Sequence, residues 1–588
     1  MKFLMDRISR RPDRNWNLQL TQNIVFLVCF ITLLAIYTRI IFITPTVYEL
    51  GDEYEYLWNA AFFTGRNWPD IYLEYYGYGY SVFLIPAIVF CKSGTGIIRA
   101  AYILNVLFII SIYCVFNGIL CVISNSKKKI YYPIISFIAC LSPYFFSNVA
   151  KVFCEICLSF FYSLDVLFIV LVLKRRRGIY YFCTGVVTAY LYAIHTRSIG
   201  IIVIYLGLLY IDYILNRKEL QKTILSIGIM MISILILFGI KSYILDYKVS
   251  LMEETTHFNN VIDGTFVFNR IMWLMSGISN YIGAFFAKIF YWFFATYGLV
   301  FLLIEYLKGD KEKKNRVEER EVIFFALSVG VVSIILCNLN GTGGNAYYII
   351  YGRYYEFSAP LLVCMGLYIL FERQVIINIK KLIFQILCMT AICKGVMSWM
   401  YSFMADYMVE IDTNRLSYFS MLIKQTPDVL EVLFVALVIV IVLLFGYMEV
   451  LKKKLPQIVC MMALAVLSLL GGKNCIDSVS IIHERTQKDL SVANYLLNNC
   501  VNDIKKIYFL DDKSYVYDNF YSRILLLIKP LDLDVIEIDT NKENTELLSE
   551  LEEKDYLITY LGSNIAMEEM NEYYKIMDGT SVTLYQKQ

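Results

Sequence analysis

The amino-acid sequence predicts a polytopic α-helical membrane protein with about 13 transmembrane helices and a small C-terminal extracytoplasmic α/β domain. Three observations carry this prediction: an excess of apolar residues, their grouping into long segments, and the distribution of charge between the segments. Of the 588 residues, 58% are hydrophobic and 18% are charged, and the mean hydropathy is +0.57. A soluble chain is about 45–50% apolar and about 25% charged. The composition therefore excludes a soluble globular enzyme and a disordered protein.

The apolar residues form segments that match the length of a membrane-crossing helix, which needs about 20 mostly apolar residues. Such segments are predicted near residues 22–43, 97–122, 131–149, 153–173, 179–195, 199–215, 223–241, 283–306, 322–338, 357–371, 381–402, 429–449 and 457–471. The first segment follows a basic stretch and is too long for a cleaved signal peptide. No small-residue cleavage motif follows it, so we expect an uncleaved signal anchor.

The basic residues concentrate in alternate gaps between these segments. The rich gaps are the N-terminus and residues 127–129, 174–177, 217–222, 308–320, 373–381 and 452–454. By the positive-inside rule these gaps are cytoplasmic. An odd number of spans then places the C-terminal domain outside the cytoplasm. We expect a multi-pass protein of the cell membrane, and the frequent Ile, Lys, Asn and Tyr are typical of a bacterial, AT-rich genome.

The chain is predicted to divide into a membrane module, residues 1–471, and an extracytoplasmic domain, residues 472–588. In the second part the fraction of charged residues rises. Short apolar runs, which we interpret as strands, alternate with segments that have a helical pattern. Strands are predicted at 506–510, 534–538, 555–560 and 581–585, and helices at 491–499, 521–528, 545–554 and 566–574. This alternation is typical of a small α/β layer. No glycine fingerprint for a dinucleotide is present.

The predicted outer gaps are long at residues 44–96, 242–282 and 338–356. In the first, residues 78–91 are apolar but too short to cross the bilayer, so we expect a helix lying at the membrane interface. The glycines of the third suit turns, and no phosphate-loop pattern is present. The net charge of +2 gives no field that would attract nucleic acid.

Acidic side chains stand at the predicted outer edge of two spans. Asp52 and Glu53 follow the first span in the sequence GDEYEY, and Glu155 opens the fourth in KVFCEICLSFF. The acidic pair is interpreted either as a solvated loop end or as a general base near the interface. An ionisable residue within a span is a functional hypothesis. The alternative for Glu155 is simple pairing with Lys151, four residues earlier.

Three arginines break the rule that outer ends lack basic residues. Arg99 opens the second span, Arg197 follows His195 in YAIHTRSIG, and Arg353 lies in YGRYYEFSAP. A single such arginine is explained by snorkelling to lipid headgroups. Three at one face of the membrane favour an anion site, because the planar guanidinium binds phosphate oxygens two at a time.

The histidines and tyrosines give weaker signals. The three histidines are far apart and form no zinc-like cluster with cysteine, and His195 is interpreted as a packed or capping residue. The tyrosine clusters at residues 72–80 and 347–355 fit an interfacial belt or stacking faces for a sugar or lipid. We interpret most of these tyrosines as the belt.

These residues, in this order, resemble the GT-C superfamily of polytopic glycosyltransferases, most of all its protein-mannosyltransferase and aminoarabinose-transferase-like branch. Each matching element is short. The first is an acidic pair followed by a helix in the first outer loop, and the next are an arginine at the start of the second span and an acidic residue at the start of the fourth. The last are a basic residue after the fifth span and an RY pair, followed by a proline, at the start of a late span. Here they are Asp52–Glu53, Arg99, Glu155, Arg197, Arg353–Tyr354 and Pro360. The resemblance covers most of the chain. The family's Pro-Pro or Lys-Pro element is replaced here by YYGYGYSVF, which leaves the acceptor groove undefined.

The resemblance implies transfer of a sugar from a polyprenyl-phosphate donor to a lipid, glycan or protein acceptor outside the cytoplasm. Asp52 is then the catalytic base, with Glu53 as the second choice, and Glu155 is a second acidic residue of the site. The donor phosphate is assigned to Arg99, Arg197, Arg353 and Tyr354. The resemblance specifies no cofactor, and we assign no metal ligand. Whether the reaction requires a divalent cation is left open.

The predicted topology supports a lipid-linked donor independently, because nucleotide sugars are not supplied at the outer face. A phosphate monoester has a second pKa of about 6 and leaves without a strong general acid. One base and cationic stabilisation suffice for an inverting displacement. The alternatives are a polymerase or ligase of surface polysaccharide, a lipid-linked sugar flippase or transporter, and a non-catalytic scaffold. A transporter would carry polar residues at mid-bilayer and repeated broken helices, which the sequence does not show.

Overall fold

The computed structural model describes most of the helical region and the strands of the C-terminal region. The described residues are 14–44, 51–66, 77–124, 129–215, 220–250, 278–308, 317–339, 351–372, 391, 417–418, 454–499, 506–511, 534–539, 555–560, 573–579 and 582–587. The predicted spans at 381–402 and 429–449 lie outside the described residues, apart from residue 391. All statements about the fold concern the described part of the chain.

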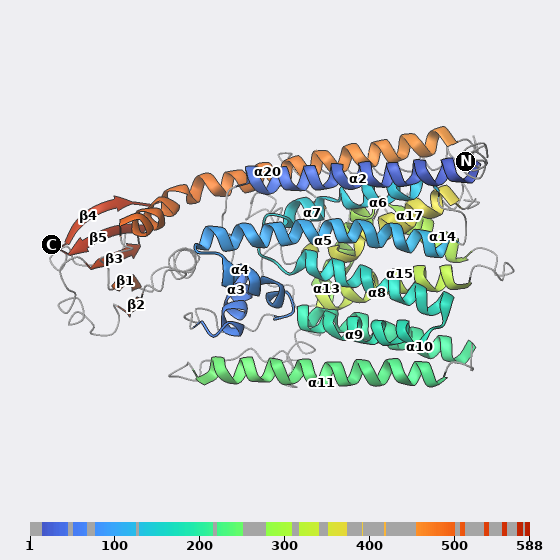
Figure 1. The fold of residues 1–588 in the computed structure, drawn as a ribbon, viewed down its shortest axis with the longest axis horizontal. Helices are drawn as coiled ribbons and strands as arrows, with labels where there is room; N and C mark the ends of the chain where they lie inside the picture. The colour runs from blue at the N-terminus through green and yellow to red at the C-terminus, as the bar shows by residue number, and fades with distance from the viewer. Residues whose placement is uncertain are drawn as a thin grey trace, which may run out of the picture.

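Helices make up the body of the protein (Figure 1). Their bounds are α2 Arg14–Ile43, α3 Gly51–Phe63, α4 Ser81–Phe90, α5 Gly94–Ile123, α6 Tyr131–Cys140, α7 Pro143–Asn148, α8 Glu155–Arg175, α9 Gly178–Ile194, α10 Ile199–Leu215, α11 Leu220–Ser250, α13 Ile278–Ala295, α14 Leu299–Lys308, α15 Val317–Leu339, α17 Ala359–Glu372 and α20 Lys454–Asn499. Three short 3₁₀ turns, η1 Thr196–Ser198, η4 Gly352–Tyr354 and η5 Glu356–Ser358, connect some of them.

The chain is a multi-pass membrane protein. Six described helices are long and apolar enough to cross a membrane, or up to seven if the bent pair Tyr281–Ala295 and Leu299–Lys308 forms one span. Four shorter apolar helices accompany them. The prediction of about 13 spans is neither confirmed nor contradicted, because two of them fall outside the described residues.

Two predicted spans are interrupted. The span predicted at 131–149 is divided into α6 and α7 where the Ser142 hydroxyl accepts a hydrogen bond from the Tyr144 N–H (3.3 Å) and Pro143 begins the new helix. The span predicted at 283–306 bends by 94° between α13 and α14. Tyr297 in this bend has a φ of 52°, a left-handed conformation that cannot continue a helix. A helix start at Ser142–Pro143 and a left-handed residue at Tyr297 therefore interrupt two segments that their continuous apolar sequence predicted to be single helices.

Helix α8 lies in the middle of the bundle, between α5 and α9, and α9 packs in turn against α11 (Figure 1). Of the largest fully buried side chains in the described part, one is tryptophan and the others are tyrosines. Tyr78, Tyr80 and Tyr355 of the two tyrosine clusters are buried. The belt interpretation is therefore wrong for these three. They tolerate burial because polar partners lie inside the bundle: the Tyr80 hydroxyl, for example, donates to Asn105 Oδ1 (3.1 Å).

A carboxylate ties the far end of α17 to the start of α6. Glu372 accepts hydrogen bonds from Tyr132 (2.7 Å) and from Tyr131, and forms an ion pair with Lys129 (2.6 Å). Its side chain is 8% exposed. These contacts join Lys129, the last residue of the predicted cytoplasmic gap 127–129, to the last residue of α17.

The C-terminal region forms one five-stranded sheet with the order β2-β1-β3-β5-β4. Its strands are β1 Lys506–Asp511, β2 Asp534–Asp539, β3 Tyr556–Tyr560, β4 Tyr573–Asp578 and β5 Val582–Lys587. β1 pairs in parallel with β2 and β3, whereas β5 is antiparallel to β3 and β4. All four predicted strands are confirmed. β4 was not predicted, and it takes the last two residues of the helix expected at 566–574.

Helix α20 connects the membrane module to the sheet (Figure 1). It is continuous for 46 residues, so the predicted boundary at residue 472 and the predicted helix 491–499 both lie within it. Figure 1 places α3 and α4 toward the end of the bundle from which α20 leaves for the sheet, and the start of α2 at the opposite end. Which of these ends faces the cytoplasm stays a prediction.

Candidate active site

The acidic helix α3 docks on the start of α8 through a short extended segment. Residues 151–154 are not helical, and Glu53 Oε1 accepts a hydrogen bond from the Val152 N–H (2.7 Å). The Tyr56 hydroxyl donates to Cys154 Sγ (2.9 Å). Glu53 is fully buried. One face of α3 is therefore held against the backbone that leads directly into Glu155.

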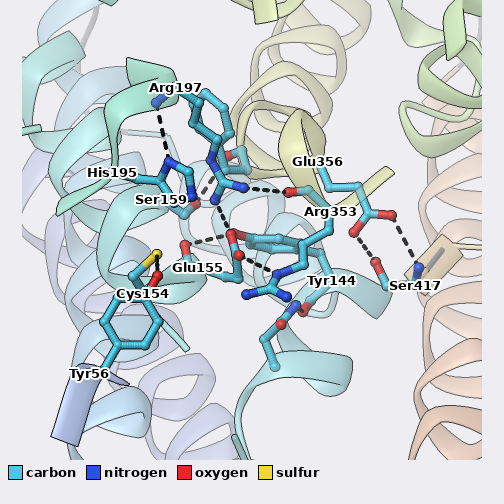
Figure 2. A network of polar contacts seen from close by, with 12 residues as sticks. Tyr56, Tyr144, Cys154, Glu155, Ser159, His195, Arg197, Arg353, Glu356 and Ser417 are labelled. Atoms are coloured by element: carbon cyan, nitrogen blue, oxygen red, sulfur yellow. Dashed lines mark hydrogen bonds and ion pairs between the residues drawn. The ribbon is translucent and has the colours of Figure 1, made fainter. Parts of the chain in front are cut away.

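Glu155 begins α8 and lies between two arginines (Figure 2). Its Oε1 pairs with Arg353 Nε at 2.6 Å, and its Oε2 pairs with a terminal guanidinium nitrogen of Arg197. The Tyr144 hydroxyl donates to the Glu155 carbonyl (2.6 Å). The site thus joins residues 155, 197 and 353, which the sequence placed at one face of the membrane but did not pair.

The interpretation that Lys151 pairs with Glu155 along a helix face is wrong. Helix α8 begins at Glu155, so Lys151 precedes it and the four-residue spacing of a helix does not apply. The Lys151 ammonium lies 5.8 Å from the centre of the Phe153 ring, and the Arg353 guanidinium lies 4.0 Å from the same ring. Phe153 therefore has two cations against its ring.

Arg197 is held by its backbone and by aromatic rings. Its N–H donates to His195 Nδ1 (3.2 Å), and its side chain donates to the Arg353 carbonyl (3.3 Å). The guanidinium lies 5.2 Å from the centre of the Tyr354 ring, which also contacts the His195 ring. Tyr354 thus lies beside the cluster, and its assignment to the donor phosphate stays a prediction. Among the described residues, the buried Nε of Arg197 has no hydrogen-bond partner.

The cluster of Glu155, Arg197 and Arg353 places two guanidiniums around one carboxylate in a buried place. The two arginine side chains are 7% and 6% exposed. His195 acts as the capping residue that the sequence suggested, because its Nδ1 accepts the Arg197 N–H. Guanidinium groups bind phosphate oxygens through charge-assisted pairs of hydrogen bonds, so the residue types of this cluster suit a phosphate group.

Arg99 lies elsewhere. Its guanidinium donates to the Thr44 carbonyl (3.0 Å), just beyond the end of α2, and faces the Phe42 and Tyr102 rings. A cation is favourable at a helix C-terminus because the last carbonyls are unsatisfied. This contact explains an arginine at this position, and a donor-phosphate role for Arg99 stays a prediction.

Asp52 lies in the first turn of α3, next to Glu53, but its side chain is outside the described part of the structure. Its assignment as base stays a prediction. In the residues that the structure describes, no group of three or more His, Cys, Asp or Glu is placed to hold a metal ion. The residues described thus supply no ligand set for the divalent cation that was left open.

The sequence reasoning missed Glu356 and the glycines of the outer loop. Glu356 follows Arg353 by three residues, and its carboxylate accepts hydrogen bonds from Tyr291 and Ser417 (Figure 2). The sequence feature that could have pointed to Glu356 is its place as the carboxylate of the otherwise basic and aromatic segment RYYE. Its partner at 417 is distant in sequence, which no local pattern reveals.

Gly77 fits the outer loop against the end of α9, two residues before Gly79, whose N–H donates to the Ala193 carbonyl (2.7 Å). A Cβ at Gly77 would lie 2.2 Å from the Ile194 carbonyl oxygen, which no side-chain movement relieves. We expect Gly77→Ala to displace this loop from the residues leading into His195 and Arg197, at a cost of about 1–3 kcal/mol. Thermal unfolding should show a lower Tm. Unchanged Tm and activity would contradict this docking, and Gly178→Ala, where the Cβ meets open space, is the control.

Comparisons with known proteins bear on the fold. No protein-family model matches the sequence, and no curated protein matches it significantly. Two solved structures are similar over almost their whole length. ArnT from Cupriavidus metallidurans in the apo state gives a TM-score of 0.52 at 10% sequence identity, with 94% of this chain and 97% of that chain covered. The same protein bound to undecaprenyl phosphate gives a TM-score of 0.50 at 11% identity, with the same coverage. The predicted polytopic helical fold is confirmed, and it is ArnT-like.

Proposed function

We propose that this chain, which has an ArnT-like fold, is a membrane glycosyltransferase that moves a sugar from a polyprenyl-phosphate donor to an acceptor on the extracytoplasmic face. The observation that carries the proposal is the buried cluster of Glu155, Arg197 and Arg353 beside the acidic helix α3. A similar fold binds undecaprenyl phosphate in one of the solved structures. A polyprenyl phosphate carries anionic oxygens of the kind that guanidinium groups bind through paired, charge-assisted hydrogen bonds.

In the proposed reaction the two arginines hold the donor phosphate. Glu155 keeps both guanidiniums oriented, and the planar forks offer further N–H groups to phosphate oxygens. As the sugar leaves, negative charge develops on the oxygen that had linked it to phosphorus. Preorganised cations at that oxygen stabilise the transition state in a site with little water.

Asp52 is the proposed base, and Glu53 is the second choice. An acceptor hydroxyl oxygen attacks the anomeric carbon and gives its proton to the carboxylate. The bond between the anomeric carbon and the phosphate oxygen breaks, and its electron pair stays on the phosphate. Attack opposite to the leaving group inverts the configuration at the anomeric carbon. Glu53 suits the role less well because it is buried and already accepts the Val152 N–H.

The test is transfer by the purified protein. A panel of polyprenyl-phosphate sugars with radiolabelled sugar should give labelled product with a bacterial membrane extract as acceptor, with and without EDTA to test for a divalent cation. Products carrying one added sugar support the transferase, whereas long labelled chains would indicate a polymerase. Labelled donor that only changes leaflet in proteoliposomes would indicate a flippase. Absence of transfer with every donor would overturn the proposal.

A further inference from the structure

Arg353 lies on a turn whose conformation is not self-supporting. Tyr351, two residues earlier, has a φ of 37°, in the left-handed region that a tyrosine rarely adopts. Two short 3₁₀ turns, η4 and η5, follow it before α17 begins. Strained backbone of this kind persists only where surrounding contacts over-determine it. The turn therefore needs an anchor, a residue of its own that contacts elements outside it.

Glu356 makes the contacts of such an anchor (Figure 2). It is buried, and its Oε1 accepts hydrogen bonds from the Tyr291 hydroxyl of α13 and from the Ser417 N–H (3.1 Å). Its Oε2 accepts from the Ser417 hydroxyl. A Cβ at Gly352 would lie 2.3 Å from the Tyr291 ring and 2.5 Å from Glu356 Oε1, so turn, ring and carboxylate are in close contact.

The partners of Glu356 are themselves held from several sides. The Tyr418 N–H donates to the Tyr291 hydroxyl (3.1 Å), and the Tyr418 hydroxyl is 2.6 Å from the Ser142 hydroxyl at the start of α7. Cys475 of α20 lies with its Sγ 3.9 Å from the Ser417 carbonyl. Segment 417–418 is thus fixed between α7, α13 and the long helix that carries the sheet.

We propose that Glu356 is the positioning residue for Arg353: it clamps the turn 351–358 to Tyr291 and Ser417 and so sets the guanidinium toward Glu155. The proposal rests on the proposed role of Arg353 in binding the donor phosphate. It assigns Glu356 no contact with substrate. Through Ser417 it also makes α20, and with it the C-terminal domain, a support of the donor site.

The clamp works by geometry and not by charge. Burial raises the pKa of Glu356 to about 7, against hydrogen bonds from Ser417 and Tyr291 that lower it. A neutral glutamine has the same shape. Its amide oxygen accepts from Tyr291 and the Ser417 N–H, and its NH₂ donates to the Ser417 hydroxyl. An alanine leaves all three donors buried without an acceptor.

The experiment compares Glu356→Ala, Glu356→Gln and Ser417→Ala in the full-length protein. We expect Glu356→Ala to raise the donor KM about tenfold or more with a smaller change in kcat. Glu356→Gln should stay within about threefold of wild type, and Ser417→Ala should fall between them because its backbone N–H remains. An unchanged KM in Glu356→Ala overturns the proposal. Equal losses in the Gln and Ala variants would show that charge is required and overturn it too.

Glu372→Ala is the matched control. Glu372 lies at the other end of α17 and also accepts from two tyrosine hydroxyls, besides pairing with Lys129. Its replacement should lower Tm and leave the donor KM within about twofold, because it is about 20 Å of helix away from the Arg353 turn. If Glu372→Ala raises the donor KM as much as Glu356→Ala does, general destabilisation explains the increase in both variants. This result would contradict the positioning role of Glu356.

A second readout separates this proposal from the proposed function. Hydrogen–deuterium exchange of a peptide covering residues 351–358 needs no donor and no activity. Exchange should be at least about tenfold faster in Glu356→Ala than in wild type or Glu356→Gln. If no polyprenyl-phosphate sugar is a substrate but this difference is seen, the clamp stands and the proposed function fails. Equal exchange in all three proteins overturns the clamp whatever the activity.

Discussion

Asp52→Asn should lose sugar transfer almost completely, with a kcat about 10²- to 10⁴-fold below wild type. Asparagine has the size of aspartate but cannot take the proton of the acceptor hydroxyl. Asp52 lies in the first turn of α3, beside a residue whose carboxylate is already bonded to the Val152 N–H. Labelled-sugar transfer by the purified variant measures the loss, and binding of unlabelled polyprenyl phosphate should stay near the wild-type affinity.

Glu53→Gln is the matched variant on the neighbouring residue. The glutamine oxygen still accepts the Val152 N–H, so docking of α3 on the start of α8 should survive and most of the kcat should remain. The reverse pattern, with full activity in Asp52→Asn and none in Glu53→Gln, would move the base to Glu53. Full activity in both variants would remove the acidic pair from the reaction.

Arg353→Ala and Arg197→Ala should weaken binding of polyprenyl phosphate, each by about 30-fold or more. Truncating one partner of a buried, hydrogen-bonded charge pair costs about 2–5 kcal/mol, and the arginine side chains are 6% and 7% exposed. Titration calorimetry with a short-chain polyprenyl phosphate in detergent measures the change. Wild-type affinity in both variants would refute the phosphate site.

Two controls separate lost donor contacts from lost stability. In Arg353→Ala, Glu155 still pairs with Arg197, whereas Glu155→Gln removes the carboxylate from both guanidiniums. The Tm should therefore fall more in Glu155→Gln than in Arg353→Ala. Arg99→Ala tests the third arginine that the sequence singled out. Its contact with the Thr44 carbonyl predicts a lower Tm. A loss of donor affinity as large as that of Arg353→Ala would support the predicted donor-phosphate role of Arg99, and unchanged affinity would exclude that role.

Much of the fold was predictable because it depends on local patterns. The strand starting at Lys506 and the helix starting near Glu155 are short-range consequences of apolar spacing and length. The break at Ser142–Pro143 and the left-handed Tyr297 were missed because mean apolarity conceals single-residue backbone effects. The strand at 573–578 was missed because it pairs with β5, and an antiparallel partner overrides a weak local helical pattern.

The candidate site was predictable only in part. The predicted topology placed Glu155, Arg197 and Arg353 at one face of the membrane. This was possible because charged residues at the outer ends of spans stand out against the alternation of basic and basic-poor gaps in a single sequence. Lys151 is the nearest cation along the chain, and helix spacing made it the alternative partner of Glu155 that the sequence offered. In the structure Glu155 instead pairs with Arg197 and with Arg353, which is 198 residues away.

The sequence by itself determined that this is a membrane protein, where most of its described helices and strands lie, and which residue types are available at one face. These properties follow from hydropathy, length and charge, which act within a few turns of the chain. Only the tertiary structure decided which charges meet. A buried ion pair must satisfy every donor and acceptor at hydrogen-bond distance, and that condition is met by packing: α3 against the start of α8, and Glu356 against Tyr291 and Ser417.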